Sequence, residues 1–323
     1  MTANTRILRP DHDGVAEAAR FIRAGQLVAM PTETVYGLAA DATDGEAVAR
    51  IFAAKGRPSF NPLIVHVPDL AAASELGGFD DTARRLAERF WPGPLTLVVP
   101  RAPGCPVTEL ATAGLDTIAL RAPSHPVARA LLAAAGRPLA APSANRSGHV
   151  SATTATHVAA DLEGRVAAIL DGGVAPHGIE STIVGFDGDD VVLLRPGAIS
   201  VEVIEAIVEH PLRRRSTGES RPNAPGQLTS HYAPRASLRL HATHAEPGEA
   251  LLAFGPACHS TGMIVNLSPA GNLVAAAANL FSSLRCLDAA GVERVAVMPI
   301  PAEGLGTAIN DRLHRAAAPK SIE

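Results

Sequence analysis

Two cations stand between a helix-like segment and a strand-like one. Lys55 and Arg57 end the helical pattern, and the β-branched run at residues 63–67 follows. Cations at a helix C-terminus are ordinary partners of the helix dipole. Pro58 and Pro62, however, make the connecting loop rigid, and a rigid loop with two cations lowers the entropy cost of ordering a phosphate site. At this point Lys55 and Arg57 could be either partners of the helix dipole or part of a phosphate site.

A third cation lies in a strand-like run. Alternation places Thr117, Ala119 and Arg121 on one face of the run at residues 117–121. An arginine on such a face is either a solvated edge residue or a clamp for a carboxylate. His66 sits in the middle of its own run, where a lone histidine is more often a core residue than a ligand.

Hydroxyl-bearing segments follow other apolar runs. Residues 31–37 contain Thr34 and a carboxylate, which suit either a small polar ligand or a helix cap. A loop with three serines and an asparagine, among them Ser143 and Ser151, follows the small-residue strand that ends at Ala141. Such a loop is usually only a loop. Ser181 and Arg195 lie at further strand edges.

Several familiar motifs are missing from the chain. It contains no G-x-x-x-x-G-K-[ST] phosphate loop and no G-x-S-x-G elbow. Residues 304–309 hold only half of a dinucleotide fingerprint, and His241 and His244 lack nearby partners for a metal site. If the protein binds a nucleotide, it uses scattered cations and hydroxyls.

The elements that must position these residues alternate between strand-like and helical patterns, which indicates an α/β layer fold. The expected strands are residues 27–30, 63–67, 95–99, 117–120, 139–141, 166–170, 181–184 and 191–194. The expected helices between them are residues 15–24, 46–54, 82–90, 126–135 and 153–161.

The composition of the sequence changes after a helical pattern at residues 201–209. Residues 211–235 are dense in proline and glycine, which argues against regular structure there and predicts a linker that could act as a lid. Strand and helix patterns then return. The sequence therefore predicts three parts: a domain at residues 1–210, a linker at 211–236 and a smaller α/β domain at 237–323.

Composition excludes some classes of protein. The chain has 323 residues with 28 basic and 32 acidic side chains, a net charge of −4 and only 3% aromatic residues. These values argue against a protein that coats nucleic acid. Three distant cysteines cannot form a disulfide framework, and no apolar run is long enough to cross a membrane. We expect a cytoplasmic protein.

Taken together, these segments resemble the YrdC family of L-threonylcarbamoyladenylate synthases in its two-domain form. The matching strings span residues 10–200 in the order of the family, and a linker string marks the longer form. They are PTETVYGL (31–38), KGRP (55–58), NPLIVH (61–66), WPGPLT (91–96), APSAN (141–145), EST (180–182), LRPG (194–197), APG (224–226) and HYAP (231–234). One departure is Ala152, where the family usually has proline.

The resemblance implies a fold and a reaction. The fold is a twisted mixed sheet flanked by helices around a concave pocket, with a small Rossmann-like second domain. The reaction joins L-threonine, bicarbonate or CO₂ and ATP into threonylcarbamoyl-AMP and pyrophosphate, and Mg²⁺ accompanies the ATP. Partner proteins then use the product to modify an adenosine next to the anticodon of certain tRNAs.

The resemblance also implies roles for single residues. Lys55 and Arg57 would be catalytic, with no residue acting as a nucleophile or as a dedicated metal ligand. The threonine contacts would be Thr34, His66, Arg121, Ala141 and Ser181. The ATP contacts would be Arg57, Asn61, Thr117, Ser143, Ser151, Arg195 and Tyr232, the last carried on the linker as a cover.

Two other functions remain alternatives. The pocket could bind RNA without catalysis, as a tRNA-binding or ribosome-associated module, which the acidic balance and rare aromatics disfavour. Carbamoyl transfer in hydrogenase maturation uses a related domain, but in much longer chains with paired zinc-type cysteines that this sequence lacks.

Overall fold

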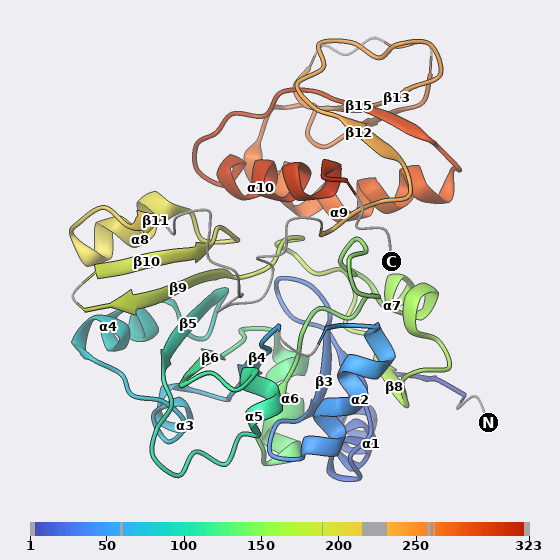
Figure 1. Cartoon of the computed structure of the whole chain (residues 1–323). Coiled ribbons are helices and arrows are strands. Elements are labelled where there is room, and N and C mark those ends of the chain that lie inside the picture. The colour runs from blue at the N-terminus through green and yellow to red at the C-terminus, as the bar shows by residue number, and fades with distance from the viewer. Residues whose placement is uncertain are drawn as a thin grey trace.

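The computed structural model describes residues 4–58, 61–188, 190–214, 231–256, 260 and 262–319. Within this part of the chain, two sheets form two domains, with the smaller one above the larger in Figure 1. The large sheet is mixed and has eleven strands in the order β1-β8-β2-β3-β7-β4-β6-β5-β9-β10-β11. The small sheet has the order β12-β15-β13-β14, and all its pairs are parallel.

The strands of the large sheet are β1 (Arg6–Leu8), β2 (Val28–Met30), β3 (Gly37–Asp41), β4 (Ile64–His66), β5 (Leu95–Pro100), β6 (Thr117–Arg121), β7 (Leu139–Ala140), β8 (Ala168–Leu170), β9 (Thr182–Asp187), β10 (Asp190–Arg195) and β11 (Arg213–Arg214). Its helices are α1 (His12–Arg23), α2 (Gly45–Lys55), α3 (Leu70–Ser74), α4 (Asp81–Phe90), α5 (Glu109–Thr112), α6 (Pro126–Ala135), α7 (Ala155–Leu162) and α8 (Val201–Val208).

Alternation along each strand divides the core of the large domain between the two faces of the sheet. On β2, Val28 and Met30 pack with α1 and α6, whereas Ala29 joins the core that contains residues of α2, α4 and α7. On β6, Ile118 and Leu120 join this second core, and Ala119 faces the opposite way. Burial of apolar area on both faces is the main contribution to the stability of such a sheet.

The second domain contains β12 (Ser237–Arg239), β13 (Ala250–Ala253), β14 (Ile264–Asn266), β15 (Arg294–Val297), α9 (Leu273–Ala289) and α10 (Gly306–Ala317). Both helices lie between the small sheet and the large domain (Figure 1). They share one apolar cluster with β13 and β15, and Tyr232 from the linker belongs to the same cluster. The helices therefore form the domain contact.

The domain contact is close and polar. Arg285 on α9 donates hydrogen bonds to the carbonyl oxygens of Val150, at 2.5 Å, and Ser151, and it forms a 2.7 Å ion pair with Asp161. A Cβ atom at Gly178 would lie 2.2 Å from the carbonyl oxygen of Ala278, so only glycine fits there. The two domains are thus held in one arrangement at this contact.

The observed architecture agrees with the predicted fold class. Each strand and helix expected from the sequence has a counterpart, and the sequence missed the short elements β1, β3, β12, α3 and α5. The expectation that regular structure is absent from residues 211–235 is wrong at β11, whose residues pair with β10. Residues 215–230 of the predicted linker lie outside the described residues. No described helix is long and apolar enough to cross a membrane.

Candidate functional site

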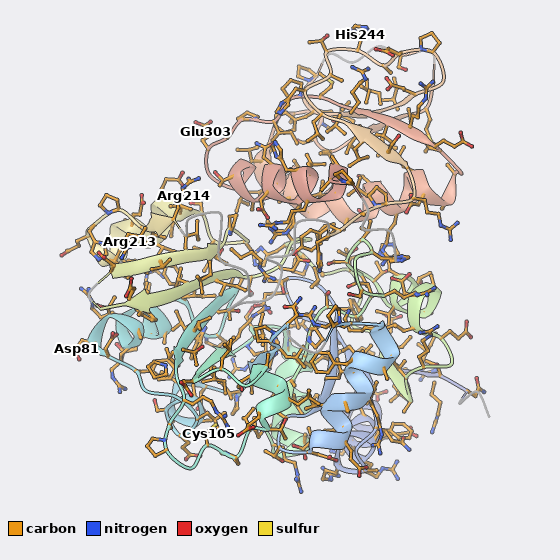
Figure 2. The ribbon with its side chains drawn as sticks, in the orientation of Figure 1. Asp81, Cys105, Arg213, Arg214, His244 and Glu303 are labelled. Atoms are coloured by element: carbon orange, nitrogen blue, oxygen red, sulfur yellow. The ribbon has the colours of Figure 1, made fainter. Side chains whose placement is uncertain are left out.

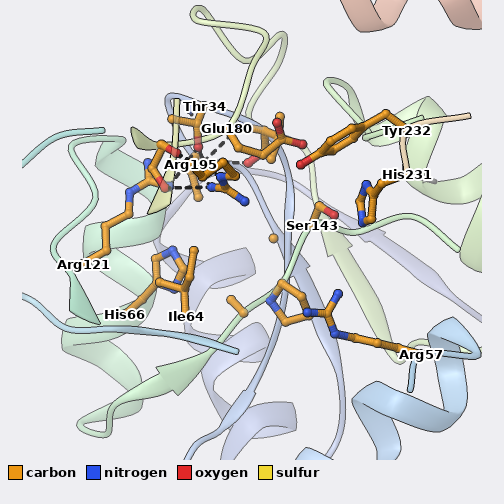
Figure 3. A pocket seen from close by; sticks show the side chains of 16 residues that line it. Thr34, Arg57, Ile64, His66, Arg121, Ser143, Glu180, Arg195, His231 and Tyr232 are labelled. Carbon is orange, nitrogen blue, oxygen red and sulfur yellow. Dashed lines mark hydrogen bonds between the residues drawn. The ribbon is translucent and has the colours of Figure 1, made fainter. Parts of the chain in front are cut away.

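A pocket of about 530 Å³, measured to its open mouth, lies on the large sheet where the linker approaches it. Strand ends and loops that are far apart in the sequence form its wall. The lining residues are Thr32, Thr34, Val35, Gly37, Arg57, Ile64, His66, Arg121, Ala141, Pro142, Ser143, Glu180, Ser181, Arg195, His231 and Tyr232. Figure 3 shows Arg121 and His66 on one side, and Arg57, His231 and Tyr232 on the other.

Arg121 is buried at the end of β6, where it pairs with a carboxylate. Its Nη2 donates to Glu33 Oε1 at 2.6 Å, its Nη1 to Thr34 Oγ1 at 2.9 Å and its Nε to the carbonyl of Gly93. Burial would raise the pKa of Glu33, but Arg121 outweighs this effect and holds that pKa below its ordinary value. Two of the five N–H donors of Arg121 remain for a ligand carboxylate.

His66 lies on the neighbouring strand β4, and its ring is buried beside Arg121. Burial, and then the charge of Arg121, lowers the pKa of His66 to about 3. The imidazole is therefore neutral at physiological pH, and no described residue forms a hydrogen bond with its Nδ1. Ala141 lies across the pocket on the chain that leaves β7, and its small side chain leaves the wall open.

Arg57 and Asn61 carry polar atoms that the protein itself does not satisfy. Arg57 donates from Nη2 to the carbonyl of Pro62 at 3.1 Å, whereas its Nε has no hydrogen-bond partner in the described part of the chain. Within the same described residues, both polar atoms of the fully buried Asn61 amide also lack a partner. Burial lowers the pKa of Arg57 to about 10, so it stays a cation at neutral pH. Buried groups left in this way are normally satisfied by a ligand or water.

Arg195 and Ser181 come together where β10 ends and β9 begins. Arg195 Nη2 donates to the carbonyl of Ser181 at 2.9 Å and to its hydroxyl at 3.2 Å. The same hydroxyl lies 2.8 Å from Thr96 Oγ1 on β5. Both side chains are buried and line the pocket.

Lys55 is not among the residues that line the pocket. Its ammonium donates to the carbonyl of Ser143 at 2.6 Å and to that of Asn145. Burial, together with the charge of Arg57, lowers the pKa of Lys55 well below its ordinary value. Lys55 therefore holds the backbone of the serine loop, while Ser143 itself lines the pocket.

Ser151 is buried and does not line the pocket, but it contacts the carboxylate of Glu180, which does. Its hydroxyl donates to Glu180 Oε1 at 2.5 Å, and Glu180 lines the pocket. Burial would raise the pKa of Glu180. The charges of Arg312 and Arg195 and the hydrogen bond from Ser151 outweigh burial and keep that pKa below its ordinary value.

The linker brings His231 and Tyr232 to the mouth of the pocket. Both side chains are buried, and their rings lie 4.0 Å apart. The Tyr232 hydroxyl and His231 Nδ1 have no hydrogen-bond partner among the residues that the structure describes. The backbone of Tyr232 has a φ of +61°, in the left-handed region that side chains rarely adopt. Strain of this kind persists only where the surroundings enforce it.

The structure brings most of the predicted site residues together, with three exceptions besides Lys55. Ser151 and Asn61 are buried but do not line the pocket. Thr117 lies at the opposite end of β6 from Arg121. It shares the face of Arg121, as alternation predicted, but four residues of strand separate the two by about 13 Å. The predicted contact of Thr117 with a nucleotide stays a prediction.

Sequence reasoning did not assign Glu33, Glu180, His231 and Arg312 to the site. Glu33, Glu180 and His231 stand inside the strings that carried the family resemblance, so their positions were a usable signal. Arg312 had no such signal, because it lies on α10 of the second domain.

Metal ligands are scarce in the described part of the chain. No group of three histidine, cysteine, aspartate or glutamate residues there is placed to hold a metal ion. Near the pocket, both oxygens of Glu180 and both of Glu33 already accept hydrogen bonds. These residues do not fit a protein cage for Mg²⁺, which prefers oxygen ligands in octahedral geometry.

The sheet, the pocket and the linker define a two-domain α/β protein with a site for small polar, anionic ligands. Residues 20–197 match the Sua5/YciO/YrdC family, described as telomere recombination, and residues 199–318 match the C-terminal domain of threonylcarbamoyl-AMP synthase. The chain belongs to this family in its two-domain form.

Individual relatives are similar to this chain over nearly its whole length. A threonylcarbamoyl-AMP synthase of Bacillus subtilis is 41% identical and covers 95% of this chain and 94% of its own. One of Pyrococcus abyssi is 40% identical with the same coverage. The crystal structure of P. abyssi Sua5 complexed with L-threonine matches with a TM-score of 0.89 at 38% identity, covering 97% of each chain.

Proposed function

We propose that this protein is a threonylcarbamoyl-AMP synthase. It would convert L-threonine, ATP and bicarbonate or CO₂ into threonylcarbamoyl-AMP and pyrophosphate, acting as a nucleotidyltransferase. The observation that carries the proposal is that one pocket holds Arg121 and His66 together with Arg57 and Arg195. The Pyrococcus relative complexed with L-threonine supports the choice of amino acid.

The side of the pocket with Arg121 suits L-threonine. The two remaining N–H donors of Arg121 would hold its carboxylate, as arginine does with planar anions. Thr34, Ser181 and the backbone at Ala141 would contact its hydroxyl and amine. The neutral His66 ring would accept a hydrogen bond from the ammonium group without repelling it.

Arg57 and Arg195 suit a triphosphate. Both cations would offset phosphate charge, with hydrogen bonds from Asn61 and Ser143 after a small movement of the loops. Tyr232 would cover the nucleotide and exclude water. Because the described residues near the pocket offer no carboxylate cage, Mg²⁺ would arrive on the phosphate oxygens of ATP.

The chemistry needs no residue as a nucleophile. The threonine amine would combine with CO₂ to give a carbamate and a proton, and a carbamate oxygen would then attack the α-phosphorus as pyrophosphate leaves. The protein would contribute positioning and charge stabilisation in a site closed to water. Partner proteins would pass the threonylcarbamoyl group to tRNA, and a cytoplasmic location stays a prediction.

The RNA-binding alternative gains no support from the basic run after α8. Arg213 and Arg214 lie at the outer edge of the large sheet (Figure 2), and Arg213 is paired with Asp187 and Asp190 at 3.0 and 2.9 Å. Both arginines belong to β11, and neither lines the pocket.

The test is pyrophosphate release by the full-length protein, with each of the three substrates omitted in turn. We expect release only when L-threonine, bicarbonate and ATP are all present, and threonylcarbamoyl-AMP as the product. Release that ignores the omission of threonine, or salt-dependent RNA binding without any turnover, would contradict the proposed function.

A further inference from the structure

An arginine of the second domain reaches the wall of the pocket. Arg312 on α10 is fully buried, with an exposed fraction of 0%. Its Nε donates to Glu180 Oε2 at 2.8 Å, and its Nη2 donates to the carbonyl of Pro196 at 3.0 Å. Its Nη1 donates to Asp311 Oδ2 at 2.5 Å. Arg312 thus contacts the large domain at Glu180 and at Pro196, the residue that follows Arg195.

Glu180 places a negative charge in the wall that also carries Arg57 and Arg195. One of its oxygens accepts the Ser151 hydroxyl and the other accepts Arg312 Nε, so the carboxylate is fixed in one orientation. A fixed carboxylate near a bound triphosphate would repel it unless a cation offsets the charge. Arg312 is the residue that forms an ion pair with Glu180.

The same guanidinium supports the linker. Its Cζ lies 4.9 Å from the centroid of the Tyr232 ring, and that ring also stacks on Phe281 of α9 with 5.6 Å between centroids. A cation over an aromatic face is attractive, more so where water is excluded. Arg312 therefore contacts both the carboxylate in the wall and the aromatic ring at the mouth.

We propose that Arg312 is a positioning residue of the ATP half of the site, which neutralises Glu180 and seats Tyr232 while contacting no substrate itself. The proposal rests on the proposed synthase function. It assigns the second domain a direct part in nucleotide binding, because α10 supplies a charge on which the pocket wall depends. In the described part of the chain, Arg312 forms no hydrogen bond with the threonine-side residues Arg121, His66 and Thr34.

The experiment is a double-mutant cycle in the full-length protein, with KM for ATP and KM for threonine measured separately. Arg312→Gln removes the ion-pair partner of Glu180 and leaves Arg195 to offset its charge alone, so KM for ATP should rise by roughly ten- to a hundredfold, the size of coupling seen within one charged network. KM for threonine should change by less than about threefold on the same scale. Glu180→Gln in the Arg312→Gln background should recover most of the lost ATP affinity.

Arg285→Gln is the matched control, because Arg285 also joins the two domains but does not line the pocket or contact Glu180. Glu180→Gln should give no recovery in that background. Thermal denaturation of every variant checks folding, and Arg312→Lys, which keeps the charge, replaces Arg312→Gln if the latter does not fold. Its KM for ATP should then lie within about fivefold of the unaltered protein.

The outcomes separate the two proposals. No turnover by the unaltered protein would count against the synthase function itself. Normal turnover with an unchanged KM for ATP in Arg312→Gln would overturn the role of Arg312. Equal rises in both KM values, or equal recovery in the Arg285→Gln background, would also overturn it, because each outcome indicates domain packing alone.

Discussion

Single residues in the pocket show how burial sets their charge. His66 is 2% exposed, and burial beside Arg121 lowers its pKa to about 3 although Glu33 acts in the opposite direction. The folded protein therefore holds this ring neutral at pH values where the unfolded chain would protonate it. A neutral ring suits a site that is proposed to bind an ammonium group.

This charge state predicts a pH dependence of stability. Below the ordinary pKa of 6.5 the unfolded chain binds a proton that folded His66 does not bind until about pH 3. The contribution of the neutral His66 ring to stability is complete above pH 6.5. As the pH decreases from 6.5 towards 3, the free energy of unfolding should fall by up to about 1.4 kcal/mol per pH unit. Urea unfolding at several pH values measures it.

His66→Gln should lose this part of the pH dependence while the other histidines keep theirs. Its stability should therefore fall less than that of the unaltered protein between pH 7 and pH 5. Parallel curves for the two proteins would show that the His66 ring is not held neutral by burial.

The sequence identified individual site residues better than their contacts. For Arg57 and Arg121 the local pattern left a structural interpretation open, and the family resemblance is what assigned Arg57, Arg121 and Arg195 to the site. The sequence could not show that Lys55 contacts backbone carbonyls, because the acceptors at Ser143 and Asn145 lie about 90 residues away along the chain.

At the scale of elements, the end of α2 and the serine loop act as one unit. Lys55 holds the loop through two carbonyl oxygens, and the amide of Ser147 in turn donates to the carbonyl of Lys55 at 2.8 Å. Arg57, two residues later, lines the pocket. Lys55 at the end of α2 thus holds the serine loop, whereas Arg57 just after the helix lines the pocket.

These roles predict different results for Lys55→Met and Arg57→Met. Loss of the Lys55 ammonium leaves two carbonyls without a charged donor, so the free energy of unfolding should fall by about 1–3 kcal/mol, together with turnover. Arg57→Met should abolish pyrophosphate release with little loss of stability, because it removes a buried charge. Denaturation and pyrophosphate assays measure both. Near-normal turnover in Arg57→Met would remove Arg57 from the mechanism.

Element prediction succeeded where local signals were strong and failed where pairing was long-range. The β-branched segments at β4 and β10 were predicted as strands. β3 (Gly37–Asp41) was missed, because its glycine and alanines carry no strand signal. Its pairing with β2 and β7 fixes it, and a Cβ on Gly37 would lie 3.3 Å from that of Ala141.

At the scale of the whole molecule, the site depends on the arrangement of the two domains. Arg312 reaches Glu180 across 132 positions of sequence, and Gly178 lets α9 approach the loop that leads to Glu180. Nothing in the local sequence around either residue predicts such a contact. The sequence therefore predicted two domains and a lid, but not that α10 reaches the pocket wall.

Gly178→Ala should disturb both the domain contact and ATP binding. Its Cβ would lie 2.2 Å from the carbonyl oxygen of Ala278, so α9 and α10 must move. Gly173→Ala is the matched control, because its φ of +80° carries similar strain but its Cβ would meet nothing within 4 Å. That strain alone costs about 1–2 kcal/mol.

We expect Gly178→Ala to lose more thermal stability than Gly173→Ala and to raise KM for ATP, which Gly173→Ala should leave near normal. Equal stability and equal KM values in the two variants would show that the contact at Ala278 does not position the site.

A crystal structure of the full-length protein with L-threonine and a non-hydrolysable ATP analogue is the most direct test of the account. The account predicts both ligands in one pocket, with the threonine carboxylate on Arg121 and the phosphates on Arg57 and Arg195. Ligands bound on separate surfaces, or phosphates that contact neither of these two arginines, would contradict it.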